Sequence, residues 1–232
     1  MIIWPPRWLD VGLQAPSPHY SVPLPNSQVS SFGVVPKKGQ PGKWHLIVDL
    51  SSLHGSSIND GINPVEFSMH YIHLDQIINM TVKHGSGALI KAKFDLEAAY
   101  QNIAVHDRYL LGMKWPGQFY VDLALPFVIH LAPYIFNSVA DLVEWIISNK
   151  YSVAGLMHYL GNFITAGPAG SLQCSQHLQT SLAICRSLGF PLHPNKCISP
   201  STHMVVLGIE LDSLEETARL PTEKLMTLQE FI

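Results

Sequence analysis

The sequence predicts an α+β fold in which an antiparallel sheet of the split βαβ type carries helices on one face. Residues 155–166 form an apolar run, a turn at Gly161-Asn162 and a second apolar run, which is the pattern of a tight β-hairpin. Apolar residues recur at helical spacing in 132–149 and again in 172–188. Because strand, helix, hairpin, helix and strand follow in that order, the strands can form one sheet against which both helices pack.

A further strand comes before the first of these helices. Residues 93–100 have the pattern of a buried strand that delivers the carboxylate of Asp95 at its end and then turns into a helix. Taken alone, Asp95 has a purely structural interpretation, because an aspartate at such a turn often caps a short helix, here one beginning near Glu97.

The rest of the chain adds two hairpins and a helix. Turn-forming residues and alternating apolar positions predict strands at 31–36 and 44–49, a hairpin of 110–115 with 118–124, and a helix near 70–82. Residues 1–28 are rich in proline, which forbids a long helix, and we expect an extended arm there.

Composition narrows the class of protein. The chain has 232 residues, of which 47% are hydrophobic, so it is long enough to bury one or two cores. Its three cysteines are odd in number and include no Cys-X-X-Cys pair, which argues against a disulfide framework or a structural zinc site. We therefore expect a reducing intracellular compartment, either cytoplasmic or nuclear.

No membrane segment is expected. The chain does not open with a basic, apolar leader, and its most apolar window, 119–136, contains Asp122, His130 and two prolines.

The charge balance bears on possible partners. The formal net charge is −3, and the one dense basic cluster is Lys37, Lys38 and Lys43. Proteins that follow a nucleic-acid backbone usually concentrate positive charge, so this balance weakens an interpretation as a nucleic-acid binder. The three lysines also have a plain interpretation as solvated side chains on an edge hairpin.

A series of segments nevertheless resembles the motifs of reverse transcriptases, in the family's order and over roughly residues 21–232. They are 32–38 and 42–50 (fingers), 95–100 (motif A), 125–137 (motif B), 155–166 (motif C), 189–197 (motif D) and 205–211 (motif E). The stretches 49–61 and 111–115 look most like the reverse transcriptases of tyrosine-recombinase (DIRS-like) retrotransposons.

The resemblance implies a division into fingers and palm. The expected parts are the arm at 1–28, fingers at 29–87 and 105–125, palm at 88–104 and 126–219, and the start of a thumb or connection helix at 220–232.

It also implies template-directed nucleotidyl transfer, which uses two Mg²⁺ ions held by carboxylates. Asp95 would bridge the metals and the Leu96 backbone carbonyl would ligate one of them. The other two carboxylates would stand at positions that are Gly161 and Asn162 here. Losing two charges from such a site costs on the order of 10³ to 10⁵ in rate, so we expect weak metal binding and no useful polymerisation.

The same resemblance places a nucleotide site. Lys38 would contact the phosphates, and His45 stands where the family has an arginine that grips the triphosphate. Phe127 and Val128 belong to motif B, and Val128 replaces an expected glycine, which crowds the backbone near the nucleotide. Tyr100 would be the aromatic plate that excludes a ribose 2′-hydroxyl.

Motif D adds Lys196 as a possible proton donor to pyrophosphate. The plain alternatives are a core aromatic for Tyr100 and a surface lysine for Lys196.

The predicted function is a reverse-transcriptase-like domain of retroelement origin that meets an RNA template and a DNA primer but is catalytically inactive. One alternative is a non-catalytic module that binds nucleic acid or protein on an inactive palm. Another is a weak polymerase that uses Asp95, Asn162 and a borrowed ligand such as Glu97 or Asp122. The oligomeric state is left open.

Overall fold

The computed structural model describes residues 28–36, 42, 44–52, 54–97, 99–106, 111–115, 118–193 and 196–229. The chain divides into two compact units, Met1–Ser68 with Ala98–Phe136 and Met69–Glu97 with Asn137–Ile232. Each unit is described by itself below.

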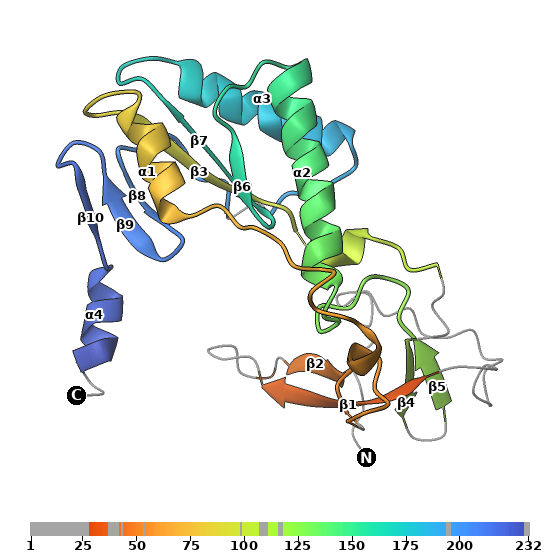
Figure 1. The fold of residues 1–232 in the computed structure, drawn as a ribbon. Helices are drawn as coiled ribbons and strands as arrows, with labels where there is room; N and C mark the ends of the chain where they lie inside the picture. The colour runs from red at the N-terminus through yellow and green to blue at the C-terminus, as the bar shows by residue number, and fades with distance from the viewer. Residues whose placement is uncertain are drawn as a thin grey trace. The chain divides into compact units, whose positions relative to one another are not determined.

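In the described part of the chain, α-helices separate groups of two or three strands (Figure 1). In order they are β1 (Val29–Pro36), β2 (Trp44–Asp49), the 3₁₀ turn η2 (Asn59–Gly61), α1 (Leu74–Val82), β3 (Leu89–Asp95), the 3₁₀ turn η3 (Ala99–Asn102), β4 (Gly112–Trp115), β5 (Gln118–Val121), α2 (Ala132–Lys150), β6 (Met157–Tyr159), β7 (Asn162–Gly167), α3 (Gln173–Ser187), β8 (His203–Val206), β9 (Ile209–Asp212), β10 (Thr217–Arg219) and α4 (Thr222–Gln229).

The first unit contains a four-stranded sheet in the order β2-β1-β4-β5. Its two hairpins, β1-β2 and β4-β5, are antiparallel, and β4 joins β1 in parallel through the pair Val29 and Gly112. A Cβ at Gly112 would lie 2.8 Å from the Gln28 carbonyl oxygen, so this close approach requires glycine.

Beside this sheet, the first unit buries a core drawn from both of its chain segments. Leu50, Leu111, Leu125, Ile129 and Ala132 are buried together, and partly buried side chains pack against them, among them Tyr100 and Val128. The core therefore joins the segment after β2 to the turn that leads into α2.

The second unit contains the antiparallel sheet β3-β7-β6. β6 and β7 form a hairpin that pairs Tyr159 with Asn162, and β3 pairs with β7 so that Phe94 faces Phe163 and Asp95 faces Asn162. The order strand, helix, hairpin and helix is the split βαβ arrangement that the sequence predicts.

The helices α2 and α3 cover one face of this sheet. The Phe94 and Phe163 rings stack at 4.7 Å and are nearly parallel, and His158 on the neighbouring strand lies against Phe163. A Cβ at Gly167 would lie 2.9 Å from that of Cys174, so glycine lets α3 approach β7 closely.

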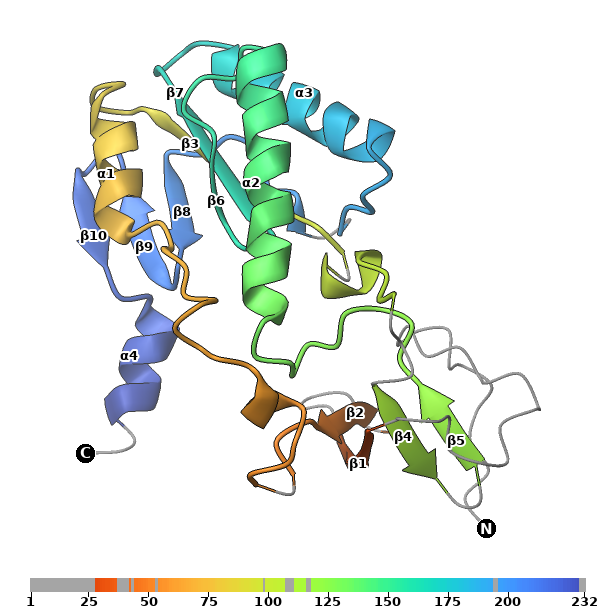
Figure 2. The ribbon, with the colours of Figure 1, turned by 45° about the vertical axis from the view of Figure 1, so that its right-hand side comes forward.

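The other face of the sheet is covered by α1 together with the β8-β9 hairpin (Figure 2). The buried residues here are Ile77, Met80, Ile164, Ala166, Met204, Val206 and Leu211. The helix predicted near 70–82 is thus α1, and it belongs to the second unit.

The sequence-based elements agree well with the structure. The predicted hairpins, the helices at 132–149 and 172–188 and the helix after residue 220 are all present, and Gly189 ends α3 in the left-handed region, at φ +84°. In the described part of the chain, no helix has the length and apolar character needed to cross a membrane.

The stacked ring of Phe163 is the strongest single test of this core. Phe163→Ala is expected to lower the free energy of unfolding by about 3–5 kcal/mol, because it leaves a cavity beneath α2 and α3. The matched control is Phe127→Ala, since Phe127 is 76% exposed and its removal should cost about 0.5 kcal/mol or less. Urea denaturation followed by circular dichroism measures both values, and equal losses would contradict the assigned core.

Candidate functional site

Asp95 and the β6-β7 turn lie side by side, as the sequence predicts. Asp95 is the last residue of β3, and its register partner on β7 is Asn162. The next residue, Leu96, donates its backbone N–H to the Gly161 carbonyl at 3.2 Å. The ladder therefore places Asp95 beside Asn162 and next to the backbone of Gly161.

The turn itself differs from the prediction by one residue. The sequence places the turn at Gly161-Asn162, but Asn162 already pairs with Tyr159, which leaves Leu160 and Gly161 as the two loop residues. Leu160, not glycine, takes the left-handed conformation, at φ +50°. A non-glycine residue held there costs about 1–3 kcal/mol, which the paired strands on both sides must offset.

Lys196 forms an ion pair with the carboxylate of Asp95. Its Nζ donates to Oδ2 at 2.6 Å, and the Asp95 side chain is 15% exposed whereas that of Lys196 is 52% exposed. A pair of this exposure contributes only about 0–1 kcal/mol to stability. Its importance is positional, because an ammonium group stands where a cation bound by Asp95 would stand.

The backbone explains why Lys196 reaches this place. Leu192 forms a bridge with Leu96, and the His193 N–H donates to the Asp95 carbonyl at 2.9 Å. The Lys196 N–H in turn donates to the His193 carbonyl at 3.1 Å. The segment after α3 is thereby fastened to the end of β3, and the lysine is carried to the carboxylate.

The donor atoms at this turn do not fit a pair of Mg²⁺ ions. Magnesium prefers hard, charged oxygen ligands, and of the three positions assigned to carboxylates only Asp95 has one. Asn162 offers a neutral amide, Gly161 offers no side chain, and Lys196 competes for Asp95. Among the described residues, no group of three or more His, Cys, Asp or Glu side chains is placed to hold a metal ion.

Two thiols lie in the same region and are poorly reactive. Burial raises the pKa of the Cys185 thiol to about 12, partly opposed by the positive charge of Arg186. Burial also raises the pKa of Cys197, with Arg186 again opposing and the charge of Asp95 adding to the increase. The pKa of Cys197, and with it the reactivity of this thiol, therefore depends in part on the charge of Asp95.

The predicted aromatic residues meet in the first unit. The Phe127 ring is 76% exposed and meets the Tyr100 ring edge-on at 5.3 Å. Tyr100 also contacts Phe136, with the ring centroids 5.3 Å apart. Tyr100 therefore packs against the core of the first unit, as its plain alternative predicts, and its contact with a ribose stays a prediction.

The remaining predicted nucleotide-binding residues are less completely described. Val128 follows Phe127 and is partly buried against the core of the first unit. His45 lies in β2 opposite Val35, and its side chain is not described. Lys38 lies outside the described residues.

The two carboxylates considered as borrowed ligands differ in environment. Asp122 is in the first unit, where burial raises the pKa of its carboxyl group and its Oδ1 accepts the Ala124 N–H at 3.2 Å. Glu97 is exposed, and its backbone N–H donates to the Pro191 carbonyl at 2.8 Å.

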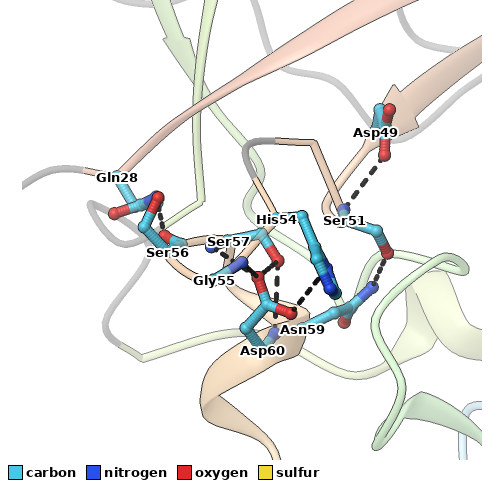
Figure 3. Close-up of polar contacts among 9 residues, drawn as sticks. All are labelled: Gln28, Asp49, Ser51, His54, Gly55, Ser56, Ser57, Asn59 and Asp60. Atoms are coloured by element: carbon cyan, nitrogen blue, oxygen red, sulfur yellow. Dashed lines mark hydrogen bonds and ion pairs between the residues drawn. The ribbon is translucent and has the colours of Figure 1, made fainter.

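Sequence reasoning missed a network built around Asn59 and Asp60 (Figure 3). The Asp60 carboxylate accepts hydrogen bonds from the Ser57 hydroxyl at 2.6 Å and from the backbone N–H groups of Ser57 and Gly55. The bond from the Ser57 hydroxyl is the main cause that lowers the pKa of Asp60. The Asn-Asp-Gly turn at 59–61 was a visible signal, but two partners of Asn59, Val128 and His130, are 69 and 71 residues away in sequence.

A buried histidine on the β6-β7 hairpin was also missed. His158 is 6% exposed, with Nδ1 2.6 Å from Oε2 of Glu144 and Nε2 3.5 Å from Oδ1 of Asp141. Both carboxylates are on α2, so the imidazole links this helix to the hairpin that carries Gly161.

No protein-family profile matches the chain, and no curated protein matches it by sequence. Solved structures do match it. The chain is similar to a foamy viral protease–reverse transcriptase (dRH) bound to double-stranded DNA, with a TM-score of 0.68 and 15% identity over 90% of this chain and 33% of that one. The same kind of protein bound to an RNA/DNA hybrid gives a TM-score of 0.63 and 16% identity over 90% and 25%. Native prototype foamy virus protease–reverse transcriptase gives 0.59 and 16% over 85% and 24%.

The chain has a reverse-transcriptase-like fold. It spans 33%, 25% and 24% of the lengths of these three chains. Within this fold, Asp95 and Asn162 are paired on the adjacent strands β3 and β7.

Thiol reactivity should report the geometry around Asp95. At pH 8, a thiol with a pKa of about 12 is ionised in only about one molecule in 10⁴, so iodoacetamide should modify Cys197 well before Cys185. Because both pKa values are raised, the rates should grow about tenfold per pH unit between pH 7 and 8. Asp95→Asn should lower the pKa of Cys197 and speed its modification.

Peptide mass spectrometry measures these rates, and unfolded protein, in which both thiols should react alike, is the control. Equal rates for the two cysteines in the folded chain would contradict the described burial.

Proposed function

We propose that the chain is a reverse-transcriptase-like domain of retroelement origin, of the DIRS-like type, that binds a template–primer duplex without extending it. The proposal rests on the side chains found around the β6-β7 turn. Asp95 faces Asn162 across the ladder, Gly161 lies beside them, and Lys196 neutralises Asp95.

Chemistry at such a site needs a concentration of positive charge that carboxylates hold in place. Two divalent ions bring about four positive charges, and one carboxylate already paired with an ammonium group cannot balance them. We therefore expect Mg²⁺ to bind weakly and nucleotidyl transfer to be lost or severely impaired.

In this proposal Lys196 has a different role from the predicted one. A lysine that donates a proton to pyrophosphate must be free to approach the phosphates, whereas this ammonium group is hydrogen-bonded to Asp95. Lys196 acts instead as a cation that supplies part of the positive charge that a metal ion would bring to Asp95.

The proposed partner is a nucleic-acid duplex of an RNA template and a DNA primer. Support comes from the solved neighbours, which are described in complex with double-stranded DNA and with an RNA/DNA hybrid. The exposed Phe127 ring beside Tyr100 is suited to stack on a base. With a net charge of −3, the affinity should be modest and should fall steeply with salt.

Primer extension tests the catalytic half of the proposal. The unmodified chain should extend a DNA primer on an RNA template no faster than Asp95→Asn does. The double variant Gly161→Asp/Asn162→Asp should bind Mg²⁺ more tightly by calorimetry and gain extension, but only in part, because His45 and Val128 remain. Robust extension by the unmodified chain that survives Asp95→Asn would overturn this account.

Binding of the duplex with and without Mg²⁺ tests the other half of the proposal, that the chain binds nucleic acid without a metal ion. Fluorescence anisotropy with a labelled RNA/DNA hybrid should give the same dissociation constant, within about twofold, in Mg²⁺ and in EDTA, because Lys196 already balances Asp95.

Lys196→Met is the informative variant for this second test. It leaves Asp95 unpaired, so binding should weaken in EDTA and recover partly when Mg²⁺ is added. Loss of binding by the unmodified chain in EDTA would contradict the substitution of a lysine for a metal ion.

A further inference from the structure

Asn59 is a buried amide that bridges two distant segments of the first unit. It is 5% exposed and sits in the 3₁₀ turn η2. Its Nδ2 donates to the Val128 carbonyl at 3.1 Å and to the Ser51 hydroxyl at 2.9 Å. Its Oδ1 accepts the His130 N–H at 2.9 Å. The amide thus both donates to and accepts from the backbone of the turn at Phe127–His130, as the backbone of a neighbouring strand would.

The loop that presents Asn59 is itself held in place (Figure 3). The next residue, Asp60, accepts the Gly55 N–H at 2.7 Å and the Ser57 N–H at 2.9 Å. The Asn59 N–H itself donates to the Leu50 carbonyl at 3.0 Å. Asn59 is therefore a fixed point against which the turn is positioned.

The turn held by Asn59 carries an aromatic side chain that the fold does not bury. Phe127 is 76% exposed, while its neighbours Pro126 and Ile129 are buried. Its ring meets the Tyr100 ring edge-on, with the ring centroids 5.3 Å apart. An exposed ring on a fixed backbone is the arrangement that base stacking uses.

We propose that Asn59 is the positioning residue of a stacking surface, and that it fixes the Phe127 ring to receive a base of the bound nucleic acid. The inference rests on the proposed function, since it names the residue that prepares the contact. Asn59 touches no nucleic acid itself and acts through Val128 and His130.

A double-mutant cycle tests this role with the labelled RNA/DNA hybrid in EDTA. Asn59→Ala and Phe127→Ala should each weaken binding, Phe127→Ala by about tenfold, which is within the range for loss of one stacked base. In the Phe127→Ala background, Asn59→Ala should have no further effect. Ser51→Ala is the matched control, because it removes one partner of Asn59 and leaves the bonds to Val128 and His130 in place.

Hydrogen exchange of the His130 amide gives a readout that does not depend on binding. Exchange should be faster in Asn59→Ala than in the unmodified chain, and unchanged in Ser51→Ala. If Asn59→Ala does not fold, Asn59→Ser serves in both measurements.

The outcomes separate the two proposals. Failure of the unmodified chain to bind the hybrid overturns the proposed function and, with it, the stacking role. If the unmodified chain binds, an equal loss of affinity from Asn59→Ala with and without the Phe127 ring overturns only the role of Asn59. Unchanged exchange at His130 also overturns it.

Discussion

The pairing of β3 with β7 is the interaction on which the rest of the second unit depends. Side chains alternate across a strand, so a slip of one residue would move Asp95 to the face that Phe94 occupies and would separate Phe94 from Phe163. The stacked rings therefore fix the register, and the register places Asp95 opposite Asn162. The packing of the core and the geometry of the candidate site are set by the same ladder.

The Asp95–Lys196 pair balances the charge of a candidate-site carboxylate within the second unit. A partly buried carboxylate with no counter-charge would be unfavourable, and the bridge between Leu96 and Leu192 brings an ammonium group to it from the same unit. The local charge is balanced by the chain itself. The architecture of the turn therefore does not require the two carboxylates absent at positions 161 and 162.

Much of this fold follows from local patterns, and the exceptions have a common cause. The hairpins and α2 are visible in the sequence because alternation and helical spacing are local, and Asp95 could be placed beside the turn from the order of the segments. The strained φ of Leu160 could not, because it depends on which residues close the hairpin. The bonds of Asn59 reach 69 and 71 residues along the chain, and those of His158 join a strand to a helix, so no local pattern reveals them.

Neither compact unit is continuous in sequence, and this shapes how the chain must fold. Residues 98–136 of the first unit are inserted between Met69–Glu97 and Asn137–Ile232 of the second, so β3 precedes the insertion and β7 follows it. During synthesis, β3 is therefore made well before β7, its partner in the ladder. In the same way, β1 is made well before its parallel partner β4. Contacts of such long sequence separation form slowly and leave strand edges open in the meantime. The nascent chain consequently passes through a stage in which neither sheet is complete. At that stage the open strand edges are most exposed to aggregation, and a chaperone would be most useful.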